Sequence, residues 1–332
     1  EMAQRITEKI SGKCVDDSDN SLFIWSDPIL EDQKMNQISR CIMTVILLMC
    51  ILSGCGSEIF KSGTETEKTL KTQTEEIKDH YSYKMKEVWC TNGNKRIYGV
   101  LYLPERKGRV PLLIYSHGLS DTHAKGELYA TSLAARGIAV YCFDFCGGSD
   151  ESKSDGKVID MSVMTEVSDL EAVLNSARKW NAIDKNKIVL AGFSQGGIVT
   201  AITAARCEEN VAGIILESPA FLIPKEAHDL FETIADIPDE YYYHFLMVGK
   251  KYFEDIWDYD VYKEIGNYKK NVLLMHGEQD DSVDIIYSEY ASEVYENVEF
   301  YRVKGAGHGV VNQMPEETMG YIFDYLHQID IF

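Results

Sequence analysis

From about residue 81 to the C-terminus, short hydrophobic runs alternate with segments whose hydrophobic residues recur at helical spacing. Short apolar runs bounded by turn-forming residues predict buried strands, and spacings of three and four residues predict amphipathic helices. The predicted strands are 96–103, 112–115, 138–143, 188–191, 211–216, 272–275 and 298–303, and the predicted helices are 127–135, 161–180, 197–205 and 315–327. The first strand alternates apolar and polar residues as an exposed strand does. This order of elements predicts a mostly parallel sheet covered by helices on both faces.

The first eighty residues carry a different pattern. Their longest apolar run, 42–52, holds about eleven residues, too few to cross the roughly 30 Å of a bilayer's hydrocarbon core. Its length and the preceding Lys34 and Arg40 are typical of a signal peptide. The run ends in Leu52-Ser53-Gly54-Cys55, which resembles a bacterial lipoprotein signal. That resemblance implies a lipid on Cys55 and an extracytoplasmic protein anchored to the bacterial cell membrane. A buried or anchoring helix is the alternative.

These patterns divide the chain into four parts. Residues 1–34 are acidic and lack periodicity, so we expect them to be a non-native or irregular extension, with Met35 as the true first residue. Residues 35–54 would then be the signal peptide. Residues 55–80 are rich in Thr, Glu, Lys and Ser and are expected to form a flexible tether. The folded domain is expected over 81–332, a length suited to one α/β domain.

Charge and cysteine content narrow the classes of function. A formal net charge of −20 argues against nucleic acid as a partner, because phosphate binding depends on clustered Lys and Arg. The eight cysteines include no CxxC pair, so neither a zinc site nor a disulfide scaffold is indicated. Cys142 and Cys146 could pair, and two buried or free thiols are the alternative. No metal or organic cofactor is expected.

The segment Gly192-Phe193-Ser194-Gln195-Gly196 has the pattern G-x-S-x-G. It directly follows the predicted strand 188–191 and directly precedes the predicted small-residue helix 197–205. Such a strand–turn–helix context is what a nucleophilic serine needs, because the tight turn exposes its hydroxyl and admits only small residues two positions away. Ser194 is therefore the predicted nucleophile, and an idle serine in a Gly-rich turn is the alternative.

A serine hydroxyl needs a neighbouring base near pH 7. Asp280 follows the predicted strand 272–275, and His308 follows the predicted strand 298–303 in a Gly-rich loop. The carboxyl ends of parallel strands meet at one edge of the sheet, so Ser194, Asp280 and His308 are expected to converge there. His308 is the predicted base and Asp280 the predicted orienting acid. His276 is expected to be structural. The competing acids are Asp281, Asp284 and Glu217.

Acyl transfer also needs amide donors for the negative charge that develops on the carbonyl oxygen. The backbone amide of Gln195, directly after the nucleophile, is one expected donor. The other is the amide of Leu119, in the loop that follows the strand 112–115, where Gly118 lets the backbone turn. A simple turn at His117-Gly118 is the alternative.

The motifs at 116–119, 192–196, 276–280 and 307–308 together resemble the α/β-hydrolase superfamily. More narrowly, the chain is similar to bacterial feruloyl (cinnamoyl) esterases and to serine aminopeptidase-like hydrolases. The resemblance implies an α/β-hydrolase fold and favours Asp280, which stands four residues after the histidine of a His-Gly turn. Those families often carry Asp-x-Arg-Gly-x-Gly-x-Ser after the fourth strand. This chain has Asp144-Phe-Cys-Gly-Gly-Ser149 there, without the arginine, so the subfamily stays open.

The long connection between the strands 211–216 and 272–275 predicts a small cap at about 221–268. Its many aromatic residues could line an acyl pocket, or they could be only the cap's own core. The predicted function is hydrolysis of a small-molecule carboxylic ester through an acyl-enzyme, with a feruloyl-type activity implied by the resemblance. A peptidase or thioesterase using the same three residues is one alternative, and a surface binding lipoprotein without activity is another.

Overall fold

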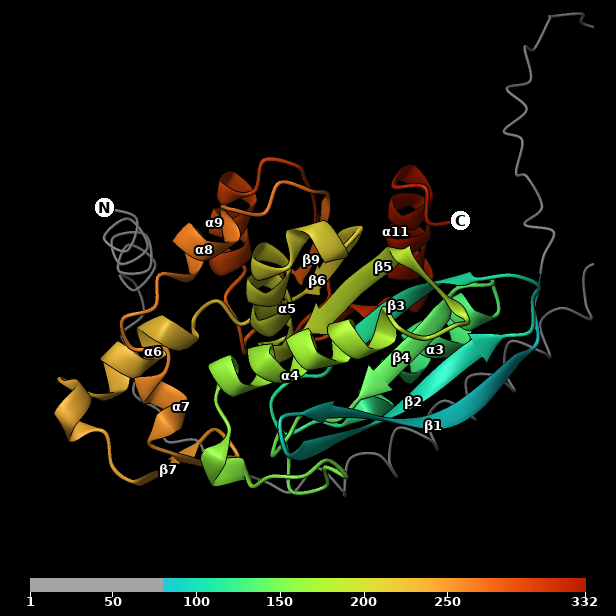
Figure 1. The fold of residues 1–332 in the computed structure, drawn as a ribbon. Coiled ribbons are helices and arrows are strands. Elements are labelled where there is room, and N and C mark those ends of the chain that lie inside the picture. Colours follow the sequence, from blue (N-terminus) through green and yellow to red (C-terminus); the bar gives the residue numbers. More distant parts are fainter. Residues whose placement is uncertain (1–79) are drawn as a thin grey trace, which may run out of the picture. The chain divides into compact units, whose positions relative to one another are not determined.

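The computed structural model describes residues 80–332. Figure 1 shows these residues as a twisted sheet with helices on both faces and a group of small elements beyond one end of it. The predicted signal peptide, Cys55 and all of the predicted tether except His80 lie outside the described residues. Within residues 80–332, no helix is long and apolar enough to cross a membrane.

The main sheet of the described residues has eight strands in the order β1-β2-β4-β3-β5-β6-β9-β10. Their bounds are β1 Tyr83–Asn92, β2 Lys95–Pro104, β3 Val110–Ser116, β4 Ala139–Phe143, β5 Ile183–Phe193, β6 Gly213–Glu217, β9 Val272–Gly277 and β10 Val298–Val303. β2 runs antiparallel to β1 and β4, and β4, β3, β5, β6, β9 and β10 are parallel to one another. The prediction of a mostly parallel sheet is therefore confirmed.

The prediction that 96–103 is an exposed strand is wrong. Residues 97–102 are buried, because β2 has β4 on one side and β1 on the other. β1 was not predicted, since its side chains are mostly exposed and carry little hydrophobic periodicity. A local signal was nevertheless present, because Gly93-Asn94 is a favourable dipeptide for a two-residue hairpin turn. These two residues connect β1 to β2, and Gly93 has a φ of 58°.

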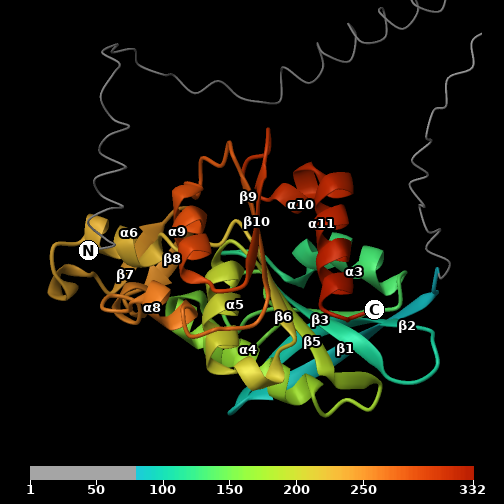
Figure 2. The same cartoon turned by 90° about the horizontal axis from the view of Figure 1, so that it is seen from above.

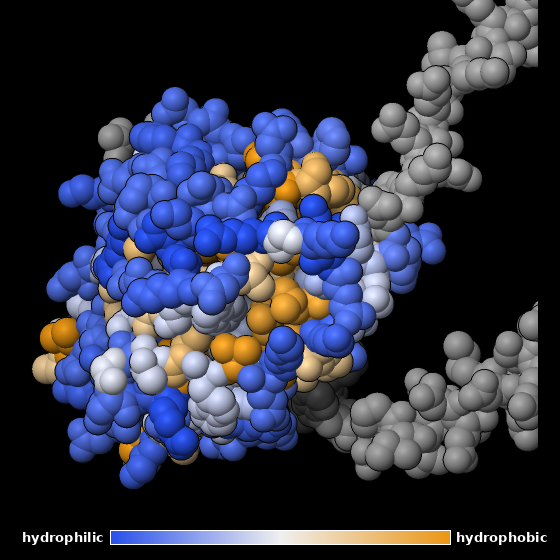
Figure 3. Space-filling model, turned by 45° about the vertical axis from the view of Figure 1, so that its right-hand side comes forward, coloured by the Kyte–Doolittle hydropathy of each residue, from blue (hydrophilic) through white to orange (hydrophobic). Residues whose placement is uncertain are grey.

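Helices cover the sheet because its inner strands are apolar on both faces. In Figure 2, α3 and α11 lie on one side of the sheet, and α4, α5 and α9 lie on the other. Their bounds are α3 Glu127–Ala134, α4 Val163–Ala177, α5 Gln195–Arg206, α9 Ile286–Val294, α10 Val310–Gln313 and α11 Pro315–Gln328. The core between the sheet and α3 and α11 includes Leu133, Val140, Ile215, Leu273 and Ile322. Figure 3 shows one face of the domain, which is mostly hydrophilic, with hydrophobic side chains gathered near its centre.

The cap lies between β6 and β9, as predicted. It contains α6 (Ile223–Leu230), the hairpin of β7 (Glu240–Tyr243) and β8 (Leu246–Gly249), α7 (Lys251–Glu254) and α8 (Val261–Ile265). Its aromatic residues serve both expected roles, and some of them serve both at once. Phe253 is fully buried in the cap's core, where its ring meets those of Phe231, Tyr241, Tyr243 and Tyr252. Tyr243 and Tyr252 also line the pocket beside Ser194.

Candidate active site

Ser194 lies in the tight turn between β5 and α5, with φ 53° and ψ −119°. This conformation is sparsely populated for residues other than glycine and marks a strained backbone. A Cβ atom on Gly192 would lie 2.1 Å from the carbonyl oxygen of Gly196, and one on Gly196 would lie 2.3 Å from that of Ser116. Both positions therefore exclude any side chain, which explains why the turn has glycine two residues before and two residues after Ser194.

Ser194, His308 and Asp280 form one hydrogen-bonded chain. The Nε2 atom of His308 lies 3.0 Å from the Oγ of Ser194, and its Nδ1 atom lies 2.8 Å from the Oδ2 of Asp280. A carboxylate can only accept, so the imidazole proton belongs on Nδ1, and Nε2 is free to accept the serine's proton. The His308 side chain is 22% exposed while that of Asp280 is fully buried. The structure thus brings together all three residues predicted for the triad.

Asp280 is held by more donors than the sequence predicted. Its Oδ1 accepts hydrogen bonds from the amides of Ser282 (3.0 Å) and Val283 (2.9 Å), and its Oδ2 lies 3.1 Å from the Nε2 of His276. Burial alone would raise the pKa of Asp280, but the hydrogen bonds from His276, His308 and Val283 outweigh it and hold that pKa well below its usual range. His276, expected to be only structural, therefore contacts the acid directly. The His276-Gly pattern was visible, but its contact with Asp280 was not.

The competing acids have other positions. Asp281 is exposed at the pocket. Asp284 accepts a hydrogen bond from the backbone amide at the first residue of α9. Glu217 is buried, and its Oε1 accepts a hydrogen bond from the amide of Val311 at 2.9 Å. The geometry therefore favours Asp280 as the partner of His308.

The loop that carries His308 is fixed by two glycines and a glutamine. Gly305 and Gly309 have φ values of 80° and 86°, which side chains rarely tolerate. The Gln313 side chain accepts a hydrogen bond from the Gly307 amide (2.9 Å) and donates one to the His308 carbonyl (2.7 Å). No sequence pattern singled out Gln313. Its side chain bridges the backbone of Gly307 and His308 and so holds the histidine in place.

The two predicted amide donors lie beside the nucleophile. Gly118 passes so close that a Cβ on it would lie 3.2 Å from the Cβ of Ser194, and Leu119 and Gln195 both line the same pocket as Ser194. Gln195 is the first residue of α5 and its amide has no acceptor within that helix. In the part of the chain that the structure describes, the Leu119 amide also donates to no protein acceptor. Both amides are therefore available to a ligand.

A buried carboxylate supports the loop that holds Leu119. The Oδ1 of Asp144 lies 2.7 Å from both the backbone amide and the Nδ1 of His123. Burial raises the pKa of Asp144, but these hydrogen bonds outweigh it and leave the pKa below its ordinary value. At the other end of the loop, the His117 ring donates to the Gly118 carbonyl (2.8 Å) and accepts from the Phe145 amide (3.2 Å). The structure thus gives His123 and Asp144 a positioning role that the sequence did not reveal.

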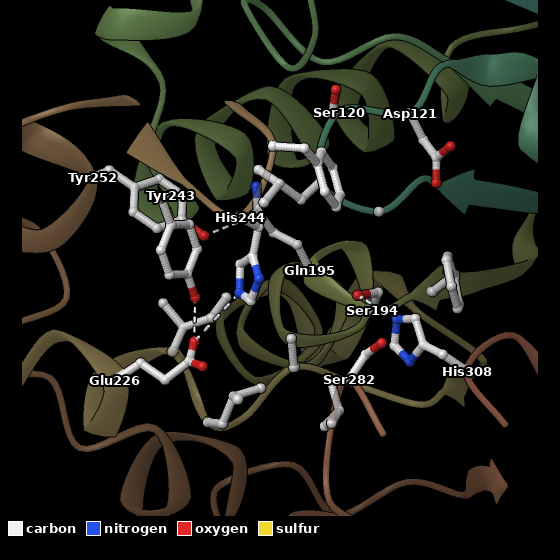
Figure 4. A pocket seen from close by; sticks show the side chains of 18 of the residues that line it. Ser120, Asp121, Ser194, Gln195, Glu226, Tyr243, His244, Tyr252, Ser282 and His308 are labelled. Atoms are coloured by element: carbon white, nitrogen blue, oxygen red, sulfur yellow. Dashed lines mark hydrogen bonds and ion pairs between the residues drawn. The ribbon is translucent and has the colours of Figure 1, made fainter. Parts of the chain in front are cut away.

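A cavity of about 690 Å³ opens above the nucleophile. Figure 4 shows Ser194, His308 and Ser282 at one side of it and Tyr243, Tyr252, Glu226 and His244 at the other. At that far side, Glu226 accepts a hydrogen bond from the Tyr243 hydroxyl and lies 3.9 Å from the Nε2 of His244. The exposed ring of Phe245, at the turn of the cap hairpin, also lines the cavity. The cap therefore supplies an aromatic wall with one carboxylate.

The structure also bears on the cysteines and on metal-binding groups. Cys142 and Cys146 are both buried and free, so they do not pair. Within residues 80–332, no group of three or more His, Cys, Asp or Glu side chains is arranged to hold a metal ion.

Several known proteins are similar to this chain in sequence. A family model described as serine aminopeptidase, S33, matches residues 109–259. The chain is 28% identical to the quorum-quenching protein AidA of Acinetobacter baumannii over 36% of this chain and 38% of that protein. It is 27% identical to a proline iminopeptidase of Thermoplasma volcanium over 61% of this chain and 67% of that protein. The chain therefore spans well under half of the length of AidA and about two thirds of the length of the iminopeptidase.

Solved structures extend the likeness to the whole domain. Est1E from Butyrivibrio proteoclasticus, with ferulic acid bound, matches with a TM-score of 0.64 at 24% identity, covering 71% of this chain and 98% of that one. An esterase of Pyrococcus furiosus matches with a TM-score of 0.56 at 23% identity, covering 75% and 91%. With the strand order and the serine turn described above, these likenesses establish that the chain has the α/β-hydrolase fold.

Proposed function

We propose that the protein is a serine hydrolase that cleaves carboxylic esters through an acyl-enzyme. The observation that carries this proposal is the continuous hydrogen-bonded chain from Ser194 through His308 to Asp280, which opens into a cavity large enough for an ester. Such a chain activates a hydroxyl that is otherwise a poor nucleophile at neutral pH.

The geometry assigns each residue a step. The Oγ of Ser194 attacks the ester carbonyl and its proton passes to the Nε2 of His308, while buried Asp280 stabilises the resulting imidazolium. The carbonyl oxygen becomes negative and is stabilised by the amides of Leu119 and Gln195. The C–O bond to the alcohol then breaks, and the alcohol takes the proton from Nε2. A water molecule repeats the sequence on the acyl-enzyme and releases the acid.

The test is the replacement of Ser194 by Ala, with hydrolysis of p-nitrophenyl acetate as the assay. The variant loses the nucleophile but keeps the fold, so kcat should fall by about 10⁴-fold or more. Circular dichroism and the melting temperature control for folding. Wild-type turnover by this variant would overturn the proposal.

For the acyl group, we propose a hydroxycinnamate or a similarly bulky aromatic acid. This rests on the aromatic wall that Tyr243, Phe245 and Tyr252 give to the cavity, and on the bound ferulic acid of the similar Est1E. Methyl ferulate and methyl p-coumarate should therefore show a higher kcat/KM than methyl acetate. Equal values would remove the aromatic specificity and leave the esterase proposal standing.

A second candidate, an aminopeptidase, is favoured by the carboxylate of Glu226 in the cavity. A carboxylate across the cavity from the nucleophile would pair with the free amino group of an aminoacyl substrate. Sequence similarity to a proline iminopeptidase points the same way. Turnover of aminoacyl 4-nitroanilides, lost on Glu226→Gln while acetate hydrolysis persists, would establish this candidate. Absence of such turnover by the wild type would exclude it.

We also propose that the protein is held at the outer side of a bacterial cell membrane by a lipid on Cys55. The support is the sequence Leu52-Ser53-Gly54-Cys55 after an apolar run of signal-peptide length. Cys55→Ser should move the expressed protein from the membrane fraction to the soluble fraction. An unchanged distribution would contradict the anchor and would not bear on the chemistry of Ser194.

A further inference from the structure

The side chain of Gln195, the residue after the nucleophile, is held at both ends of its amide group. Its Nε2 donates to the Oε2 of Glu166 at 2.9 Å, and its Oε1 accepts from the hydroxyl of Tyr252 at 2.7 Å. Gln195 is 1% exposed, and Glu166 and Tyr252 are 1% and 0% exposed. The three side chains form one buried polar cluster, which we call the Gln195 cluster.

Burial makes this cluster costly to break. A buried amide, carboxyl or hydroxyl without a partner loses its hydrogen bonds to water and gains nothing in return. Burial also raises the pKa of the Glu166 carboxyl well above its ordinary value, although the bond from Gln195 opposes that rise. Each member therefore depends on the others, and the amide of Gln195 has one favoured orientation.

The cluster joins three parts of the fold that meet under the pocket. Glu166 belongs to α4, Gln195 is the first residue of α5, and Tyr252 belongs to α7 of the cap. Figure 4 shows Gln195 between Tyr252, at one side of the pocket, and Ser194, at the other. The cap is thus tied directly to the residue whose backbone amide is the proposed oxyanion donor.

We propose that Tyr252 and Glu166 are positioning residues, which fix the Gln195 amide of the oxyanion hole by holding its side chain. This inference rests on the proposed function, because it assigns the cap a part in stabilising the tetrahedral intermediate besides lining the pocket. An error of a fraction of an ångström in a donor's position weakens transition-state stabilisation, whereas ground-state binding of a small ester hardly depends on that donor.

Tyr252→Phe removes the hydroxyl and keeps the ring, so it isolates the contact with Gln195. With p-nitrophenyl acetate, whose acyl group is too small to reach most of the cap, kcat should fall about tenfold and KM should change little. That loss lies below the roughly 10²–10³-fold cost of removing an oxyanion donor altogether. The matched control is Tyr262→Phe, which removes another cap hydroxyl, one that donates to the carbonyl of Tyr287 and lies outside the pocket. Its kcat should equal that of the wild type.

The inhibition constant of phenylboronic acid provides a second measurement, which looser packing alone would not change. Its boron accepts a lone pair from the Oγ of Ser194, the serine's proton passes to His308, and an anionic boronate oxygen occupies the oxyanion hole. Its inhibition constant should rise in Tyr252→Phe by about the same factor as kcat falls, and stay unchanged in Tyr262→Phe.

A second variant covers the case in which Tyr252→Phe does not fold. Gln195→Leu keeps the backbone amide but removes both side-chain hydrogen bonds, so it should show the same pattern, and the double variant should lose no more than either single one. Unchanged kcat and boronate inhibition in a folded Tyr252→Phe or Gln195→Leu variant would overturn the inference. Failure of the wild-type protein to hydrolyse any ester would instead overturn the proposed function.

Discussion

A comparison of Asp280→Asn with Asp281→Asn tests which of these two neighbouring carboxylates acts on His308. Both substitutions remove one negative charge from adjacent residues of the same loop. Asp280 accepts hydrogen bonds from His308 and from the amides of Ser282 and Val283, whereas Asp281 is exposed at the mouth of the pocket. Only the first change should therefore alter the chemistry at Ser194.

The expected magnitude follows from the geometry at the Oδ2 of Asp280. In the Asn variant, the side-chain oxygen keeps its bonds to the two loop amides, and the amide nitrogen then faces the Nδ1 of His308. Two donors cannot bond, so the proton of His308 moves from Nδ1 to Nε2, and Nε2 can no longer accept the proton of Ser194. For a Ser-His-Asp arrangement this costs about 10⁴-fold in kcat, or roughly 5.4 kcal/mol at 1.36 kcal/mol for each tenfold change.

The assay is the steady-state hydrolysis of p-nitrophenyl acetate at pH 7.5 by wild type and both variants. Asp280→Asn should lose kcat with little change in KM, and Asp281→Asn should stay near the wild type. A kcat for Asp280→Asn within tenfold of the wild-type value would refute the assignment of the acid. Equal losses of kcat in both variants would show that catalysis depends on the charge of the loop and not on the contact between Asp280 and His308.

The same variant predicts a change in acid stability. The folded state holds the pKa of Asp280 well below its usual range, so ionisation of this group stabilises the fold above the unfolded pKa of about 3.9. That contribution is lost as the pH falls through the folded value. The melting temperature of Asp280→Asn should therefore decline less than that of the wild type between about pH 5 and pH 2. Parallel declines would contradict the cause given for the shift.

Three further predictions follow from the surroundings of the site. Gly196→Ala places a methyl group against the Ser116 carbonyl oxygen, so little folded protein should be recovered; a soluble variant with wild-type melting temperature would contradict this. Burial raises the pKa of Glu217, so its stabilising contribution is present below the unfolded value of about 4.3 and is lost as the pH rises through the folded value. The melting temperature of the wild type should therefore drop relative to that of Glu217→Gln as the pH rises above about 4.3. A constant difference would contradict this. Gln313→Leu removes both bonds that hold the loop of His308, so kcat should fall with little change in KM, and an unchanged kcat would show that the glycines suffice.

The inner strands and the three site residues were predictable because their signals are local. Strands buried on both faces appear as continuous apolar runs, and the next residues along the chain lie at the carboxyl edge of the sheet. Ser194 and Asp280 each follow such a strand, and His308 follows β10, a partly buried strand at the edge of the sheet. Their meeting at the carboxyl edge therefore needed no knowledge of side-chain contacts. Gly192 and Gly196 also indicated the tight turn locally, because they stand two residues before and two residues after Ser194.

Features that depend on contacts between distant residues were not predictable. β1 is an edge strand with mostly exposed side chains, so it lacks the apolar run on which the other strands were recognised. The bond from His276 to Asp280 and the burial of Glu166 against Gln195 depend on how loops and helices pack. A glutamate in an amphipathic helix is ordinarily expected at the surface. Glu166 stands three residues after Val163 and four before Leu170, so helical spacing placed it on the buried face of α4, but it gave no sign of its partner Gln195.

The position of β1 at the rim of the sheet has a consequence for how the protein behaves when concentrated. Among the described residues, β1 pairs with β2 along one side and is the outermost strand. An outer strand of ten residues could template the strand of another molecule. This strand carries three charged residues, Lys84, Lys86 and Glu87. Charges on an edge strand oppose its pairing with a strand of another molecule. We therefore expect these charges to oppose the pairing of a further strand at this rim, although Met85 and Trp89 on the same strand are exposed.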